Sequence, residues 1–331
     1  MPIPCVLGLD IGGANLKAAH SDGLARLMPF ALWRNPDGLP DALRNLIRPL
    51  PRFDMLAVTM TGESCDCYET KRQGVVSILD AVLKLADRTP IRVWTTSGSF
   101  TSLDEAKDQF IKTASANWLA LATFAGRYVP AGSSLLIDIG STTTDIVPLL
   151  DGTPAPRGRT DRERLKNREL VYTGVRRTPV CALLGMDGAA ELFATSLDVH
   201  LLLGNLRENV EDRNTADGRP ATRGAAHARL ARMIGEDLEA FSEHEAKELA
   251  QEVVNRQLTA LGDAVMKVES DHRIHPETVV ISGEGEFLAR RALGNVEVIS
   301  LADELGPEIS KSACAYAVAI LAQESIMDQS W

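Results

Sequence analysis

Apolar residues along this 331-residue chain alternate between short runs and longer stretches with helical spacing. The short runs predict strands at residues 4–9, 15–20, 25–33, 55–60, 91–95, 135–137, 144–150, 278–281 and 296–299. The helical spacing predicts helices at residues 41–50, 74–86, 115–125, 225–234, 246–268 and 307–323. Residues 151–177 are rich in Gly, Pro and charge and form the least regular region. Strands and helices thus alternate in both halves, which predicts an α/β fold.

Two stretches of the chain repeat one polar pattern. Leu9–Lys17 and Ile137–Ile146 each place Asp-Ile-Gly after an apolar run, 128 positions apart (138 minus 10). One such turn could be an ordinary hairpin, but a pair, each opening its half, favours a duplicated molecule with a shared cleft. We therefore predict two ribonuclease-H-like domains, residues 1–130 and 131–331, facing that cleft, with a helical insertion at about 183–268.

The residues of these turns suit an anion. A glycine lets the backbone approach a phosphate closely, and neighbouring N–H groups and hydroxyls donate to its oxygens. The predicted phosphate-binding residues of the two turns are Gly12, Gly13, Asn15, Gly140, Ser141, Thr142 and Thr143.

Acidic residues end both strands. Asp10 and Asp138 would converge in the cleft and repel each other unless a cation lies between them, so we expect them to bind Mg²⁺ together with a phosphate. Lys17 can add a point charge for the same phosphate.

A third glycine loop follows the apolar run at residues 278–281. Gly283 and Gly285 are predicted to contact phosphate, as loops after buried strands often do in open α/β domains. Glu284 and Glu286 would repel a phosphate, so we expect them to bind a cation or an amine.

The composition of the chain limits the kinds of partner that it is expected to bind. A net charge of −10 argues against general nucleic-acid binding, which needs a basic face. No run approaches the roughly 18 apolar residues that span a bilayer, and the first strand leaves no room for a leader, so we expect a cytoplasmic protein without a membrane partner. A homodimer is possible.

The two turns and the Ser282–Glu286 loop resemble the phosphate-one, phosphate-two and adenosine elements of the superfamily of actin, sugar kinases and related chaperones. Within it, the chain is similar to the hydantoinase/oxoprolinase-type group. It resembles most the branch of tetrahydromethanopterin-linked C1-transfer proteins of methylotrophs, which is similar to the methanofuran-biosynthesis condensing enzyme of methanogens. Further matching segments are Thr61-Gly62-Glu63, Lys71 with Gly74, Ala116-Asn117-Trp118, Glu169–Gly174, Arg177-Thr178-Pro179 and Thr215–Arg219.

This resemblance implies an alkyl transfer. The phenol oxygen of γ-glutamyltyramine would attack the methylene of an aminomethyl-furanmethanol diphosphate and release diphosphate, with charge taken up by Mg²⁺, Lys17 and the turn amides. Glu63 or Asp145 would accept the phenol proton. Glu284 or Glu286 would pair with the aminomethyl group. Lys71, Asn117, Trp118 and Arg177 are the other expected substrate contacts. For Trp118, packing in a core is favoured over stacking on a substrate, and Arg177 could equally be exposed on the surface.

Two other functions fit the same sequence. One is an ATP-dependent enzyme, either a small-molecule kinase or a hydantoinase-like amidohydrolase, and the other is a nucleotide-binding scaffold without catalysis. Fold alone does not choose among these classes.

Overall fold

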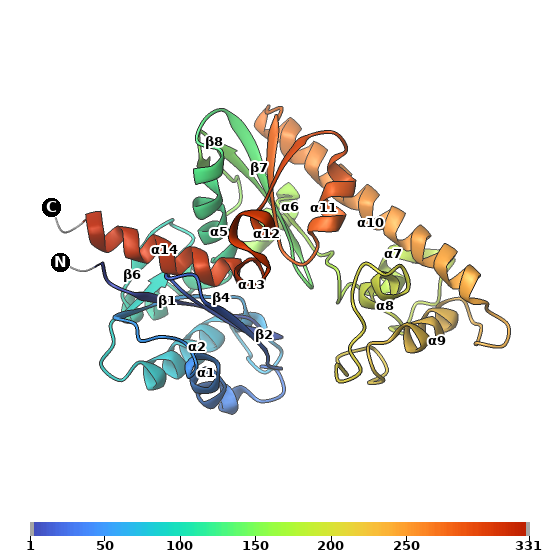
Figure 1. Ribbon diagram of the computed structural model, residues 1–331, viewed down its shortest axis with the longest axis horizontal. Helices are drawn as coiled ribbons and strands as arrows, with labels where there is room; N and C mark the ends of the chain where they lie inside the picture. Colours follow the sequence, from blue (N-terminus) through green and yellow to red (C-terminus); the bar gives the residue numbers. More distant parts are fainter. Residues whose placement is uncertain (1–2, 329–331) are drawn as a thin grey trace.

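Residues 3–328, which the computed structural model describes, form two six-stranded sheets with helices on and between them (Figure 1). The first sheet has the order β3-β2-β1-β4-β5-β6. Its strands are β1 (Val6–Ile11), β2 (Asn15–His20), β3 (Ala25–Pro29), β4 (Met55–Met60), β5 (Ile91–Trp94) and β6 (Phe100–Thr101). The second sheet has the order β10-β8-β7-β11-β12, with β9 beside β8. Its strands are β7 (Ser133–Ile139), β8 (Thr144–Leu150), β9 (Thr153–Pro154), β10 (Leu170–Val171), β11 (Thr278–Ser282) and β12 (Glu297–Ser300).

The centres of the two sheets have the same topology. β1 pairs antiparallel with β2 and parallel with β4, which pairs parallel with β5. β7 likewise pairs antiparallel with β8 and parallel with β11, which pairs parallel with β12. This arrangement confirms the predicted α/β fold of duplicated ribonuclease-H-like units.

Helices separate the two sheets. α5 (Asn117–Ala125) and α14 (Ala313–Asp328) pack against each other, and their side chains share one apolar core with residues of both sheets. Gly8 permits this close packing, because a Cβ at Gly8 would lie 1.9 Å from the Ala315 carbonyl oxygen. α14 contacts β1, β2 and β4, whereas α5 contacts β7, β8 and β9. A helix from the first half thus packs on the second sheet, and the last helix packs on the first sheet. The domain boundary near residue 130 stays a prediction.

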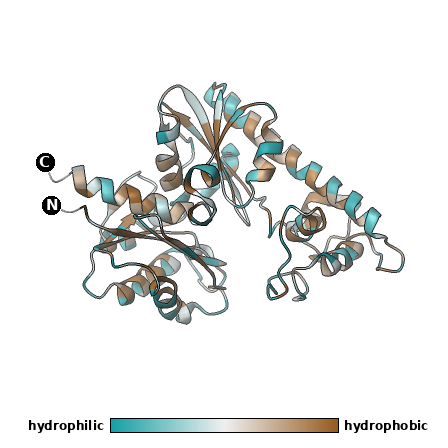
Figure 2. Ribbon diagram, in the orientation of Figure 1, coloured by the Kyte–Doolittle hydropathy of each residue, from teal (hydrophilic) through white to brown (hydrophobic). Residues whose placement is uncertain are grey.

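The outer faces carry separate cores. α1 (Leu39–Ile47) and α2 (Lys71–Ala86) cover the first sheet. On the second sheet lies α10 (Glu243–His272), which begins with a capping box between Ser242 and Glu245. Apolar and polar residues alternate along α10, which is consistent with a helix buried on one side (Figure 2).

α10 also packs against a helical lobe, which we define as α7 (Val180–Leu184), α8 (Ser196–Leu202) and α9 (Arg223–Met233) (Figure 1). The remaining helices are α3 (Leu103–Asp108), α4 (Phe110–Thr113), α6 (Asp161–Asn167), α11 (Glu286–Leu293), α12 (Leu301–Leu305) and α13 (Pro307–Ser310), with short 3₁₀ turns at Pro36–Gly38, Gly62–Ser64, Gly126–Tyr128 and Gly185–Asp187. The helix predicted at 307–323 is thus divided into α13 and α14. Within residues 3–328, no helix combines the length and apolarity needed to cross a membrane.

Candidate functional site

The two Asp-Ile-Gly turns have the same geometry. The Gly12 N–H donates to the Asn15 carbonyl at 3.0 Å, and the Gly140 N–H donates to the Thr143 carbonyl at 2.9 Å. The hairpin register places Asp10 opposite Lys17. The equivalent register places Asp138 opposite Asp145, so a carboxylate replaces the lysine in the second turn.

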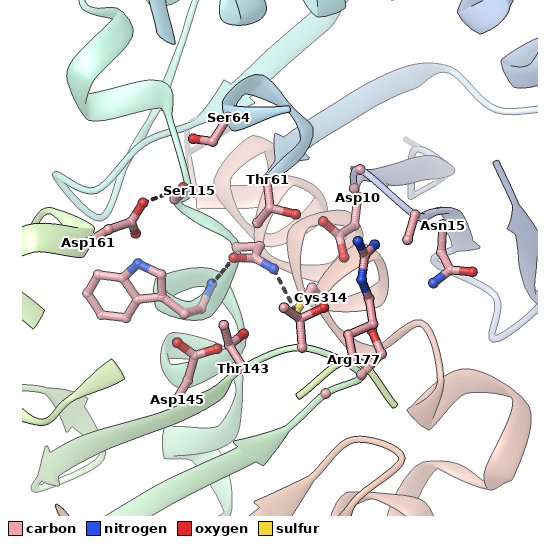
Figure 3. A pocket seen from close by; sticks show the side chains of 18 of the residues that line it. Asp10, Asn15, Thr61, Ser64, Ser115, Thr143, Asp145, Asp161, Arg177 and Cys314 are labelled. Atoms are coloured by element: carbon pink, nitrogen blue, oxygen red, sulfur yellow. Dashed lines mark hydrogen bonds between the residues drawn. The ribbon is translucent and has the colours of Figure 1, made fainter. Parts of the chain in front are cut away.

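A cavity of about 430 Å³ lies between these turns, within the usual size range of small-molecule sites. Figure 3 shows Asp10, Asn15 and Arg177 toward one end of this cavity, and Ser115, Asp145 and Asp161 toward the other. We call these the turn end and the acidic end. Most of the predicted site residues line the cavity, namely Asp10, Gly12, Gly13, Asn15, Lys17, Asn117, Trp118, Asp138, Gly140, Ser141, Thr142, Thr143, Asp145 and Arg177.

Lys17 balances the carboxylates at the turn end. Its Nζ lies 3.5 Å from Asp10 Oδ2. Burial acts to lower the pKa of Lys17, but the neighbouring Asp10, Cys314 and Asp138 raise it above the ordinary value of a lysine. Burial raises the pKa of Asp10 despite this lysine. Asp10 Oδ1 is buried and has no hydrogen-bond partner among residues 3–328, so it can still accept from a ligand or bind a cation.

We expect Asp138→Asn to stabilise the ligand-free protein above pH 6. Burial and the nearby Asp145 raise the pKa of Asp138 from 3.8 to about 6. The folded state therefore holds a proton that the unfolded state releases, so the wild type loses stability as the pH rises through this window. The gain should be roughly 1–3 kcal/mol at about pH 8 and vanish below pH 4. Urea unfolding at both pH values tests this, with the exposed Asp303→Asn as the control. A gain that does not change with pH would contradict it.

The loop after β10 aligns Arg177 with the second turn. The N–H groups of Arg176 and Arg177 donate to the Ser141 carbonyl at 3.0 and 2.9 Å. Gly174 makes this packing possible, since a Cβ there would lie 2.6 Å from the backbone of Ser141 and Thr142. The guanidinium of Arg177 lies 5.0 Å from the ring centroid of Trp33, a cation–π distance. Arg177 therefore lines the cavity at the turn end.

Trp118 belongs to the core and to the cavity at once. Its side chain is 2% exposed, and Arg164 stacks 3.9 Å over its ring. Arg164 is itself buried, donates to Asp145 Oδ1 at 2.7 Å and donates to the Glu169 carbonyl at 2.9 Å. Asn117 accepts from the Trp118 N–H at 2.8 Å and lies 3.8 Å from the Cys314 sulfur.

The third glycine loop lies outside the cavity wall. Glu284 forms a two-pronged ion pair with Arg176, with both contacts at 2.6 Å. Glu286 accepts from the Ser300 hydroxyl and from the Ala302 N–H, so it caps the start of α12. Gly283 and Gly285 pack against Ile139, whose carbonyl accepts from the Gly285 N–H, and a Cβ at Gly283 would lie 2.7 Å from Asp138 Oδ1. None of these four predicted residues lines the cavity, and protein groups already engage both carboxylates.

Glu63 and Lys71 lie behind the acidic end. Glu63 is fully buried and accepts from the Ser115 hydroxyl at 2.8 Å. Lys71 donates to Asp161 Oδ2 at 3.0 Å. Neither lines the cavity, but both contact residues that do.

Sequence reasoning missed several cavity residues, notably Ser115, Asp161, Arg164, Tyr172 and Cys314. Asp161 and Arg164 lie on α6, within the region predicted to be irregular. The signal that could have found this helix is the capping box formed by Thr160 and Glu163. Ser115 carries no comparable signal, since only the folded chain places it between two carboxylates.

A separate cluster of potential metal ligands, Cys5, His20 and Asp22, lies at the opposite end of β1 from Asp10. His20 is fully buried, and its ring contacts the Arg52 carbonyl through Nε2. Its Nδ1 already accepts from the Asp22 N–H at 3.2 Å. The only lone pair of the neutral His20 ring, on Nδ1, is thus already used in a hydrogen bond. His20 therefore has no free lone pair with which to bind a metal ion in this cluster.

Comparison with known proteins agrees with this fold and shows the family of the chain. The hydantoinase/oxoprolinase family profile matches residues 54–325. The chain is 33% identical over 332 residues to the (4-{4-[2-(γ-L-glutamylamino)ethyl]phenoxymethyl}furan-2-yl)methanamine synthase of Methanocaldococcus jannaschii, covering 97% of this chain and 98% of that enzyme. A synthase of the same name from Methanococcus vannielii is 31% identical over 206 residues, covering 58% of this chain and 91% of that one.

Among solved structures, nucleotide-free acetone carboxylase superposes with a TM-score of 0.54 at 12% identity, over 95% of this chain and 70% of that one. This similarity concerns the fold alone. The two sequence matches are more specific, because one covers nearly the entire length of both proteins. The chain therefore belongs to the hydantoinase/oxoprolinase family, and it is an enzyme of the group that contains these methanogen synthases.

Proposed function

We propose that this enzyme condenses a furanylmethyl diphosphate with the phenol oxygen of γ-glutamyltyramine or a close derivative, releasing diphosphate, in methanofuran or methylofuran biosynthesis. The observation that carries the proposal is the 33% identity to the furan-methanamine synthase over 97% of the chain. The name of that relative contains a phenoxymethyl ether on a furan ring. Forming such an ether requires one bond between a phenol oxygen and the furan methylene.

The two ends of the cavity suit the two halves of this reaction. Lys17, Arg177 and the residues of both turns would bind the diphosphate and stabilise the charge that grows as the C–O bond breaks. The furan oxygen stabilises a positive charge on the methylene as the diphosphate departs, so this bond can break early. Trp118, which lines the cavity, would help to exclude water, which would otherwise capture the methylene.

The donor set also fits Mg²⁺. Asp10 and Asp138 offer carboxylate oxygens, which this hard cation prefers, and Asp10 Oδ1 has no partner among the described residues. These two residues would hold the ion. When bound, it would neutralise part of the diphosphate charge.

Incubating the purified enzyme with both organic substrates tests the proposed function. We expect the ether by mass spectrometry and one diphosphate per ether, with no requirement for ATP. Omitting either substrate should abolish release, and chelating Mg²⁺ should lower it strongly. ATP consumption would instead indicate a kinase or an ATP-dependent amidohydrolase. Nucleotide binding without turnover of any kind would indicate a scaffold.

A further inference from the structure

Four polar side chains from three separate segments meet at the acidic end of the cavity. Ser115 Oγ lies 2.8 Å from Glu63 Oε1 and 3.1 Å from Asp161 Oδ2. Lys71 lies 3.0 Å from the same Asp161 oxygen. Glu63 follows β4 and Lys71 begins α2 in the same segment, Ser115 precedes α5, and Asp161 begins α6. The group therefore joins the first sheet's side of the cleft to the second's.

The backbone of Ser115 is unusual. Its φ of 49° is a left-handed conformation that residues other than glycine and asparagine seldom adopt. Such conformations persist where the surrounding structure enforces them, often at functional sites. Here the conformation accompanies a hydroxyl held between two carboxylates.

The Ser115 hydroxyl lies within hydrogen-bond distance of two carboxylates but has only one proton to donate. A hydroxyl has a single proton, so Ser115 cannot donate to both carboxylates at once. The shorter contact assigns that proton to Glu63, which also accepts from the Ser64 hydroxyl at 3.2 Å. The Ser115 oxygen then turns a lone pair toward Asp161. A proton arriving on Asp161 would complete this second hydrogen bond.

In-line displacement decides which end of the cavity holds the phenol. The attacking oxygen must approach the methylene from the side opposite to the departing diphosphate. With the diphosphate at the turn end, the phenol comes from the acidic end, where two carboxylates line the cavity. Asp145 is held by the buried Arg164 and has no hydroxyl relay among the described contacts. Asp161 is 24% exposed and contacts Ser115.

On the basis of the proposed function, we infer that Asp161 is the general base that removes the phenol proton, and that Ser115 relays this proton to Glu63. The aryl C–O bond forms as the C–O bond to diphosphate breaks, and the departing oxygen keeps the electron pair. The phenol proton moves to Asp161, a proton passes from Asp161 to Ser115, and the original Ser115 proton moves to Glu63. The ion pair between Asp161 and Lys71 is then restored.

Burial supports Glu63 as the final acceptor. Its burial raises the pKa of Glu63, although the hydrogen bond from Ser115 opposes this effect. Glu63 Oε2 is buried without a partner among residues 3–328, so the carboxylate is poorly compensated until it takes up a proton. The other ionisable groups facing Asp161 are Lys71, Asp145 and Tyr172.

Asp161→Asn tests the base directly, with ether formation measured against pH for γ-glutamyltyramine and for its ring-fluorinated analogue. We expect about a 10²–10⁴-fold loss of kcat near neutral pH. The loss should shrink as the pH approaches the phenol pKa of about 10, because phenolate needs no base. It should also be smaller for the more acidic fluorinated phenol. An equal loss at every pH and for both acceptors, or no loss, would overturn the inference.

Ser115→Gly tests the relay without backbone strain, because glycine adopts a positive φ freely. We expect this variant to lose rate with the same dependence on pH and on the acceptor, and it decides the question if Asp161→Asn does not fold. A wild-type rate in Ser115→Gly would overturn the relay. The matched control is Asp80→Asn, which removes a comparable aspartate–lysine pair with Lys107 outside the cleft and should keep full activity.

Ether formation by the wild-type enzyme distinguishes a failure of the proposed function from a failure of the inference about Asp161. If it forms no ether, the proposed function falls and the inference with it. If it forms the ether and Asp161→Asn forms it equally fast at neutral pH, the inference alone falls.

Discussion

Lys17→Gln is expected to lower kcat/KM for ether formation by about 10³-fold, the largest effect of any single change at the turn end. Lys17 lies 3.5 Å from Asp10 and also faces Asp138. Removing its charge leaves the two carboxylates of Asp10 and Asp138 beside the place where a diphosphate must bind. The substrate is then repelled and the leaving group loses a compensating charge, so both KM and kcat should suffer. Steady-state kinetics with saturating phenol measures both constants.

Two further variants make this prediction specific. Lys17→Arg keeps the charge but spreads it over a larger planar group, so it should recover only part of the lost rate. Lys107→Gln removes a lysine that pairs with Asp80 outside the cleft and should leave the kinetics unchanged. A Lys17→Gln enzyme with wild-type kcat/KM would show that the diphosphate binds elsewhere.

Arg164→Gln is expected to lower the free energy of unfolding by about 3–5 kcal/mol, because it leaves the Asp145 carboxylate, which is only 13% exposed, without its partner. Arg164 is 1% exposed, pairs with Asp145 at 2.7 Å and stacks on Trp118. Such a loss is a large share of the total stability of a typical domain, about 5–15 kcal/mol. The deficit should grow as the pH rises, since only the ionised carboxylate lacks compensation. Urea unfolding at two pH values measures it.

The chain offers a close control for Arg164. Arg127 also pairs with a carboxylate, that of Glu324, and stacks 4.2 Å over the Phe124 ring, but its side chain is 37% exposed. Arg127→Gln should therefore lower the stability by only about 0–1 kcal/mol. The double variant Asp145→Asn with Arg164→Gln should recover part of the loss, because no unpaired charge remains. Equal losses for Arg164 and Arg127 would contradict the assigned role of burial.

Local patterns predicted much of the fold. The apolar runs located β2, β4 and β8 to the residue and most other strands to within one or two residues, because strand formation follows local alternation and composition. The paired Asp-Ile-Gly turns predicted the duplication, and the hairpin register then follows from the short turn itself. α6 was missed, since seven residues with weak periodicity form a helix here only with their cap and their packing.

Charge complementarity alone did not indicate the partner of Glu284 in the third glycine loop. Glu284 looked available for a substrate amine, yet Arg176, 108 positions earlier in the chain, engages both of its oxygens. Asp161, which we infer to be the base, lies in a stretch that seemed irregular, and Ser115 lies 46 positions from it. Contacts at such separations leave no local trace in the sequence.

The sequence alone therefore determined the two turns and the acidic and basic residues that they carry, because a turn is specified by a few neighbouring residues. Only the tertiary structure decided which carboxylates are compensated, by Lys17 for Asp10 and by Arg164 for Asp145, and which one faces the cavity beside Ser115. The physical reason is that the charge and proton affinity of a buried group depend on its neighbours in space, which the packing of the two sheets and α5 brings together.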